Sequence, residues 1–301
     1  MNQQTTLVTG GTGFVGSHLL PLLDRAILTT RNVQRAQQKI GGDENQFLKW
    51  SDQLKIDPAT KIDSVVNLMG ESIAEGRWTA AKKERIRTSR IDATKTLVDE
   101  ILKLNTPPKV MVSASAVGIY GDPGEAEVDE SFPPAENYLG EVCRDWESEA
   151  LRLSDHGVRV VLLRIGIVLG RGGGAIDKML PLFKLGLGGR LGNGKQWVPW
   201  IHVNDLVGMI QWAIENESIT GPLNASAPNP VRNSEMTSAM AKAVGRFAIL
   251  PAPKFALRLA LGEFANSLFS SQKVIPRVAN DGGFQFQYPT IESALDEIVN
   301  E

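Results

Sequence analysis

The chain has 301 residues, 42% of them hydrophobic and 22% charged, which is typical of a globular protein of one or two domains. Its 32 Lys and Arg against 34 Asp and Glu give a net charge of -2, so no basic excess indicates a nucleic acid or an anionic membrane as partner. The single cysteine excludes an intrachain disulfide, and three scattered histidines predict no metal site. The sequence contains no signal-peptide pattern and no apolar run of membrane-spanning length, so we expect a cytoplasmic protein.

Short aliphatic runs alternate with helical patterns along the first two thirds of the chain. This order predicts an α/β fold, with a Rossmann-type, doubly wound parallel sheet. The expected strands are Thr6–Thr9, Ala26–Thr29, Gln46–Trp50, Ser64–Met69, Lys109–Ser113 and Val158–Ile167. The expected helices begin at Phe14, where Pro21 should produce a kink, and cover Thr79–Lys103, with Thr79 as N-cap, and Leu139–Ser154.

The residue composition changes after Leu169, where glycines and then prolines become frequent. We expect a nucleotide-binding domain at 1–170 with 199–226, and a smaller C-terminal substrate lobe at 171–198 with 227–301. Within these parts we expect a short strand and helix over Trp200–Asn216, capped by Asn204 or Asp205, and an amphipathic helix over Phe255–Phe269. The loop Gly170–Gly174 is either a backbone nest for an anion, with Arg171 and Lys178 beside it, or a hinge.

A glycine-rich turn near the start of the chain carries the strongest functional signal. It reads Thr9-Gly10-Gly11-Thr12-Gly13-Phe14-Val15-Gly16, between an apolar strand and a helix. Gly10 permits the tight turn, Gly13 lets backbone N–H groups approach a diphosphate, and Gly16 allows close packing of the helix. The helix N-terminus adds orphan donors and a favourable dipole. The alternative is a glycine turn that binds nothing; we predict instead a dinucleotide site with contacts from Gly10, Thr12, Gly13, Phe14 and Val15.

The end of the second strand indicates which dinucleotide binds. An adenosine ribose with a free 2′-hydroxyl is usually held by an Asp or Glu at this point, but the chain has Leu28-Thr29-Thr30-Arg31-Asn32 there. A guanidinium suits a 2′-phosphate, so Arg31 favours NADP over NAD. Otherwise Arg31 is only a solvated strand end. After the fourth strand, Leu68, Met69 and Gly70 offer a further place where backbone passes the cofactor.

Several segments together resemble the extended short-chain dehydrogenase/reductase superfamily: the glycine turn, Asn67–Gly70, Ser113–Gly121 and Trp200–Asp205. More narrowly, Gly70–Ile73, Ser89-Arg90, Trp146-Glu147, Gly170–Ala175, Gly188–Gly192 and Ser271–Pro276 resemble an atypical branch, the NAD-dependent epimerase/dehydratase-like proteins. The resemblance covers essentially the whole chain. It implies a Rossmann fold, NADP binding, a C-terminal lobe over the nicotinamide, and a cofactor contact at Arg90.

The chain departs from the superfamily at the catalytic helix. Redox members pair a tyrosine with a lysine four residues later, which lowers the pKa of the phenol. Ser115 matches the serine of that machinery, but Tyr138 is followed at this spacing by Val142, and no lysine lies between Lys109 and Lys178. The family therefore leaves Ser115 and Tyr138 as candidate catalytic residues, without the Tyr/Lys dyad; a helix-start tyrosine and a strand-end serine are the simpler interpretations.

Five other side chains favour a structural interpretation. Cys143 has no histidine near it in sequence and is expected to be a small core residue rather than a nucleophile. His202 is expected to be a satisfied structural histidine rather than a general base, and Tyr120 a packing residue. Trp200 and its neighbour Trp197 can stack on a ligand ring, although core packing is the commoner use of tryptophan.

Two functions compete. The first is an NADP-dependent oxidoreductase or epimerase-like enzyme that acts on an unidentified small polar metabolite, with proton transfer by water, Tyr138 or the substrate itself. The second is a non-catalytic NADPH-binding sensor or scaffold, because the loss of a tuned proton donor typically costs about 10²–10⁴-fold in rate. In either case the expected partner is a small molecule. The sequence leaves the substrate and the oligomeric state open.

Overall fold

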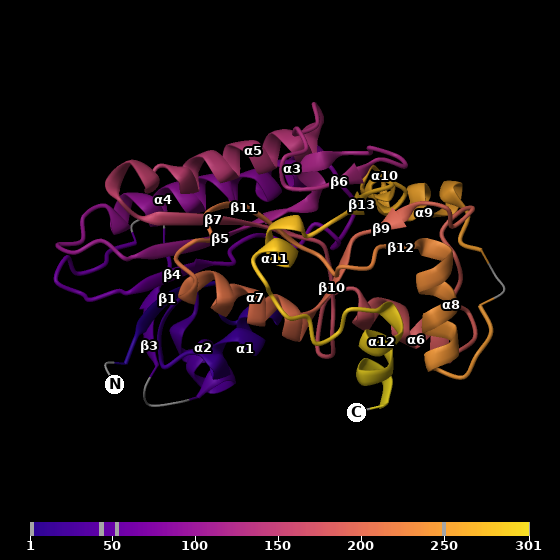
Figure 1. The fold of residues 1–301 in the computed structure, drawn as a ribbon, viewed down its shortest axis with the longest axis horizontal. Helices are drawn as coiled ribbons and strands as arrows, with labels where there is room; N and C mark the ends of the chain where they lie inside the picture. The colour runs from indigo at the N-terminus through magenta and orange to yellow at the C-terminus, as the bar shows by residue number, and fades with distance from the viewer. Residues whose placement is uncertain (1–2, 42–44, 52–53, 249–250, 301) are drawn as a thin grey trace.

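The structure, a computed structural model, describes residues 3–41, 45–51, 54–248 and 251–300. Its centre is a seven-stranded parallel sheet (Figure 1). The strand order reverses between β1 and β4, and in doubly wound sheets this reversal leaves a crevice outside the carboxyl ends of the strands. In sheet order the strands are β3 (Gln46–Lys49), β2 (Arg25–Thr30), β1 (Thr5–Thr9), β4 (Ser64–Asn67), β5 (Val110–Ala116), β7 (Arg159–Ile165) and β11 (Gly221–Ala225).

Helices cover both faces of the sheet (Figure 1). One face carries α1 (Phe14–Leu19), α2 (Val33–Ile40) and α7 (Val203–Glu215), and the other carries α3 (Ala80–Thr88), α4 (Ile91–Ile101) and α5 (Tyr138–Leu151). Because successive side chains of a strand point to opposite faces, Val8 packs in the core under α7 while Leu7 packs in the core under α4 and α5. Strands buried on both faces in this way need continuous apolar runs.

A smaller lobe lies beyond the carboxyl ends of the strands and has its own core, in which Trp200 is 1% exposed (Figure 1). Three two-stranded sheets lie outside the central sheet, and one of them pairs residues 273–274 of the lobe with residues 127–128. No helix of the described residues is long and apolar enough to cross a bilayer. The lobe and its connections comprise β6 (Glu127–Val128) with β13 (Lys273–Val274), β8 (Ile167–Leu169) with β10 (Trp200–His202), β9 (Trp197–Val198) with β12 (Val231–Arg232), α6 (Ile176–Lys184), α8 (Asn233–Ala243), α9 (Lys254–Leu261), α10 (Phe264–Leu268), α11 (Arg277–Asp281) and α12 (Ile291–Asn300). The division into two domains stays a prediction.

The six expected strands are confirmed, with shifts at their ends. The run 158–167 divides at Gly166 into β7 and β8, because the chain there passes so close to another segment that a Cβ would lie 2.9 Å from the Pro199 oxygen. Pro21 was expected to kink the first helix; α1 instead ends at Leu19, and a 3₁₀ turn over Leu20–Leu22 contains the proline, so the kink stays a prediction. The helix α2 was not anticipated; its N-cap is Asn32, whose side chain accepts from the Arg35 N–H.

The prediction of one helix over 79–103 is wrong. Thr79 caps α3 as expected, but the helix ends at Thr88 and α4 starts at Ile91. At the break, the Ser89 hydroxyl accepts a hydrogen bond from the Glu71 N–H at 3.0 Å. A contact between segments 18 residues apart therefore interrupts a pattern that is locally helical.

Two further predictions about helix ends are wrong. The helix expected over 255–269 divides into α9 and α10 at Gly262, where a positive φ of 63° is combined with a β-bridge to Trp78. The cap of α7 is His202, whose ring nitrogen accepts from the Asn204 N–H, rather than Asn204 or Asp205. The Asp205 carboxylate instead accepts from the backbone N–H groups of Gln287 and Tyr288.

We expect Gly16→Ala to lower the free energy of unfolding by about 1–3 kcal/mol, because a Cβ at Gly16 would lie 2.5 Å from the Gly11 Cα and 2.6 Å from the Gly10 oxygen. Gly208→Ala is the matched control in α7, since the nearest atom to its Cβ is at 3.8 Å. There the helix propensity of alanine should raise stability by up to about 1 kcal/mol. Urea unfolding of both variants measures the difference, and equal shifts would contradict the close approach.

Candidate functional site

The glycine turn leaves β1 and leans on the carboxyl end of β4. Gly10 has a φ of 69°, and the Gly13 N–H donates to the Gly10 oxygen at 2.9 Å. A Cβ on Gly10 would lie 2.7 Å from the Leu68 oxygen, so only glycine permits this contact between the two segments. Gly13 itself is exposed, and its missing side chain keeps the backbone of the turn open to a ligand.

Arg90 lies beside the segment that follows β4. A Cβ at Gly70 would be 3.1 Å from the Arg90 Cζ, and the guanidinium lies 5.3 Å from the centre of the Trp146 ring. One N–H of Arg90 donates to the Ile86 oxygen at 3.1 Å, and burial lowers the pKa of Arg90 below its ordinary value. The break between α3 and α4 thus places a half-buried cation beside Gly70, the last of the three predicted contacts at this strand end.

Arg31 lies at the other side of the glycine turn. Thr9 of β1 is in register with Thr29 of β2, so the residue after β2 lies next to the start of the turn. Arg31 is exposed there. The structure therefore brings the predicted cofactor residues to the carboxyl ends of three adjacent strands, β2, β1 and β4; their contacts with a cofactor stay predictions.

The segment 71–78, between β4 and α3, connects the sheet to the lobe. Its start is held by Glu71, whose carboxylate accepts from Lys82 at 2.6 Å; this hydrogen bond holds the pKa of Glu71 below its ordinary value. Its middle contacts α6, because the Lys178 ammonium donates to the Ala74 oxygen at 2.8 Å. Its end packs Trp78 on Phe264 of α10, with ring centres 5.6 Å apart.

The loop 170–174 packs on the first residue of α1. A Cβ at Gly173 would lie 2.6 Å from the Phe14 ring, so glycine is required for this contact. Arg171 donates to the Ile298 oxygen of α12 at 2.6 Å. Both cations that were considered for an anion nest, Arg171 and Lys178, are thus bonded to backbone carbonyls, and the loop joins the glycine turn to the C-terminal helix.

Ser115, a candidate catalytic residue, belongs to a buried polar network. Its hydroxyl donates to the Glu147 carboxylate of α5 at 2.6 Å. The same carboxylate accepts two hydrogen bonds from Arg164 of β7, at 2.9 and 3.0 Å, a bidentate pair whose side chains are 8% and 6% exposed. The sequence alone did not identify this pair, although Arg164, which follows four apolar residues in the run 158–167, was a signal that this arginine needs a buried partner.

The network continues through Tyr120, which is a buried residue as expected. Arg164 donates to the Tyr120 hydroxyl at 2.9 Å, and this hydroxyl donates to Asn224 of β11 at 2.7 Å. Burial raises the pKa of Tyr120 to about 12, so the phenol stays protonated. Glu130 accepts from the Asn224 N–H at 3.0 Å, and burial raises the pKa of its carboxyl.

Tyr138, the second candidate catalytic residue, lies at the start of α5. Its hydroxyl donates to the Lys83 oxygen of α3 at 2.6 Å, and burial raises the pKa of its phenol. Its ring packs edge-on against Trp78. The hydroxyl is therefore occupied by a backbone carbonyl, and a role in proton transfer stays a prediction. Cys143, one turn further on, is buried, and burial raises the pKa of its thiol to about 12, as expected for a core residue.

His202 has the structural role that was expected. Its Nδ1 accepts from the Asn204 N–H at 3.2 Å, so Nε2 carries the proton and donates to the Glu297 carboxylate of α12 at 2.9 Å. The ring packs on Tyr288 with centres 3.9 Å apart. Burial lowers the pKa of His202 below its ordinary value, although Glu297 opposes this shift.

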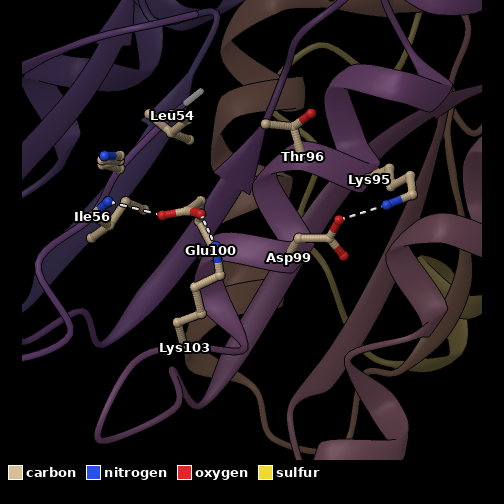
Figure 2. A pocket seen from close by; sticks show the side chains of 8 residues that line it. Leu54, Ile56, Lys95, Thr96, Asp99, Glu100 and Lys103 are labelled. Atoms are coloured by element: carbon tan, nitrogen blue, oxygen red, sulfur yellow. Dashed lines mark hydrogen bonds and ion pairs between the residues drawn. The ribbon is translucent and has the colours of Figure 1, made fainter. Parts of the chain in front are cut away.

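A hollow of about 630 Å³ lies away from this edge (Figure 2). Arg90 precedes the first residue of α4, whereas the hollow is lined by the last turns of that helix, so it lies toward the opposite ends of the strands. Figure 2 shows Glu100 accepting from the Ile56 N–H, with Lys103 on its other oxygen. No predicted site residue lines the hollow, which is formed by Leu54, Lys55, Ile56, Lys95, Thr96, Asp99, Glu100 and Lys103.

Comparisons with known proteins agree over the whole chain. Residues 6–224 match the NAD dependent epimerase/dehydratase family, and residues 252–298 match a domain of unknown function, DUF1731. The epimerase family protein SDR39U1 homolog, chloroplastic, of Arabidopsis thaliana is 41% identical over 99% of this chain and 87% of its own length. The epimerase family protein YfhF of Bacillus subtilis is 37% identical over 97% of both chains.

A solved structure is also similar over its full length. The human epimerase family protein SDR39U1, crystallised with NADPH, superposes with a TM-score of 0.91 at 36% identity, and covers 99% of this chain and 100% of the human chain. The UDP-glucuronic acid 4-epimerase of Bacillus cereus has a TM-score of 0.78 at 16% identity, which shows the fold alone.

We expect Arg164→Met to lower the free energy of unfolding by about 3–5 kcal/mol, because it leaves the Glu147 carboxylate buried without its cation. Arg152→Met is the control: Arg152 also pairs with two carboxylates, but its side chain is 38% exposed, so the loss should stay below about 1 kcal/mol. The double variant Glu147→Leu/Arg164→Met should recover much of the stability. Chemical unfolding measures all three, and equal losses at Arg164 and Arg152 would contradict this account.

We also expect stability to depend on His202 below neutral pH. Because the pKa of His202 is lowered in the fold from 6.5, the unfolded chain binds more protons between these two values, and stability falls as the pH falls through that window. Replacing His202 by Gln should therefore cost less stability at pH 5 than at pH 7.5. His156→Gln, at an exposed position, is the control for the substitution itself. Parallel pH profiles for wild type and His202→Gln would contradict the prediction.

Proposed function

Because the chain belongs to the NAD dependent epimerase/dehydratase family, we propose that it binds NADPH and acts as an oxidoreductase or epimerase-like enzyme on a small polar metabolite. The observation that carries this proposal is the glycine turn against the end of β4, with Arg31 rather than a carboxylate after β2. A guanidinium there fits a 2′-phosphate. The human relative crystallised with NADPH supports this choice.

The residues of the carboxyl edge fit such a cofactor. The backbone of the turn, with Thr12, Phe14 and Val15, holds the diphosphate, and Arg31 holds the 2′-phosphate. Leu68, Met69 and Gly70 line the nicotinamide half, with Arg90 beside them. When bound, NADPH would supply a hydride and its oxidised form NADP+ would accept one, and the role of the protein is to position the cofactor.

Proton transfer needs a different arrangement from the Tyr/Lys dyad, since α5 contains no lysine. Ser115 is the first candidate, because its hydroxyl donates to the Glu147 carboxylate at 2.6 Å and is oriented by this hydrogen bond. Tyr138 is the second, and it must first release the Lys83 carbonyl. We propose that the partner is a small molecule rather than a nucleic acid or a membrane, and the net charge of -2 is consistent with this choice. We propose the cytoplasm as the compartment.

A non-catalytic NADPH sensor or scaffold is the second candidate function. The occupied hydroxyl of Tyr138 and the missing lysine favour it. In this case NADPH acts by joining the sheet to the lobe across the segment 71–78 and the loop 170–174, and hydride transfer to a substrate does not occur.

Arg31→Ala tests the cofactor choice. We expect NADPH to bind at least about tenfold more weakly, because a charge-assisted hydrogen bond to the 2′-phosphate is lost, while NADH binding changes little. Arg25→Ala, at the opposite end of the same strand, should leave both affinities unchanged. Nicotinamide fluorescence measures the dissociation constants. Equal affinity of the wild type for NADPH and NADH would overturn the proposal.

Absorbance at the nicotinamide band separates the enzyme from the sensor. We expect a substrate-dependent change in a screen of carbonyl compounds and sugar nucleotides, and a fall of about 10²–10⁴-fold in kcat for Ser115→Ala with NADPH affinity unchanged. Ser113→Ala is the control on the same strand. Tight NADPH binding with a silent screen would favour the sensor, and a signal that survives Ser115→Ala would remove the role of this serine.

A further inference from the structure

Lys39, in the last turn of α2, reaches back to the glycine turn. Its ammonium donates to the Thr12 oxygen at 2.7 Å, although 27 residues separate the two. Side chains of a helix lean toward its N-terminus, which here is the end next to Arg31. Arg31 approaches the same turn from β2, through the parallel register of β1 and β2. Lys39 therefore contacts the glycine turn, and Arg31 follows the strand that lies beside the start of this turn.

Three cations belong to α2 and to the residues just before it. Arg31, Arg35 and Lys39 are all exposed, and none forms an ion pair with a carboxylate in the described part of the chain. Arg35 and Lys39 are four residues apart on α2, a spacing at which like charges destabilise a helix. The Thr12 carbonyl is neutral and uses one of the three donors of the ammonium, so two remain for an anion.

We propose that Lys39 is a second specificity-determining residue for NADPH, which binds the adenosine 2′-phosphate together with Arg31. This inference rests on the proposed function. The Lys39 ammonium would bond both the 2′-phosphate and the Thr12 carbonyl. The 2′-phosphate, which distinguishes NADPH from NADH, would thereby be connected to the turn that holds the diphosphate. Arg31 alone has no such contact with the turn among the described residues.

Lys39→Met is the test, because methionine keeps the length and the apolar stem and removes only the ammonium. We expect NADPH and the fragment 2′,5′-ADP to bind about fivefold more weakly or worse, as for loss of one exposed charge-assisted contact. NADH and 5′-AMP should bind as they do to the wild type. Lys39→Arg should retain most of the preference for the 2′-phosphate. Lys55→Met, on the distant hollow of Figure 2, controls for the loss of one surface charge.

Fluorescence titration and calorimetry measure these constants without any turnover, and urea unfolding checks that each variant keeps its stability. Equal weakening of NADPH and NADH would show that Lys39 only shapes the glycine turn, and would overturn the inference. Unchanged affinities for all four ligands would overturn it as well. After either result the proposed function still stands if Arg31→Ala weakens the binding of NADPH more than that of NADH. If the wild type binds neither dinucleotide, the proposed function itself is wrong.

Discussion

The bidentate pair of Glu147 and Arg164 is the interaction on which the carboxyl edge of the sheet depends. Two ionised groups with side chains under one tenth exposed are tolerated only when each is fully bonded. This requirement determines how α5 lies on β7, orients the hydroxyl of Ser115, and extends through Tyr120 to Asn224 of the edge strand β11. The Asn224 side chain in turn donates to the Ile275 oxygen, so the pair also anchors the segment that leads from the lobe to α11.

The same helix, α5, differs in composition from a helix with a Tyr/Lys pair, because it contains no lysine. One turn before Glu147, α5 presents Cys143, whose thiol is buried and has its pKa raised to about 12, so it carries no charge at neutral pH. The positive charge near this edge comes instead from Arg90, at the break between α3 and α4. A guanidinium with a single bond to Ile86 and its face on Trp146 keeps donors free for a ligand, but it does not act as a general acid at neutral pH.

The two halves of the proposed cofactor site differ in how the protein treats charge. At the nicotinamide half, the Glu147–Arg164 pair is buried and structural, and its removal lowers the stability of the fold. At the adenosine half, Arg31, Arg35 and Lys39 are solvent-exposed, so they contribute little to the fold and act mainly through the ligand. Selection between dinucleotides is therefore separable from folding, and the glycine turn connects the two halves through its contacts with Leu68 and with Lys39.

Local signals were enough for the strands of the sheet, the glycine turn and the cap at Thr79, because each depends on residues a few positions apart. Long-range contacts decided the rest. The helix break at Ser89 is made by Glu71, the cap of α7 is a histidine held by Glu297, 95 residues away, and Ser115 is bonded to a carboxylate 32 residues later. In each case one sequence window contains only half of the interaction. From such a window one can predict that a polar side chain, if it is buried, needs a hydrogen-bond partner. The window does not identify the partner, because only the packing of the folded elements brings the second group within hydrogen-bond distance.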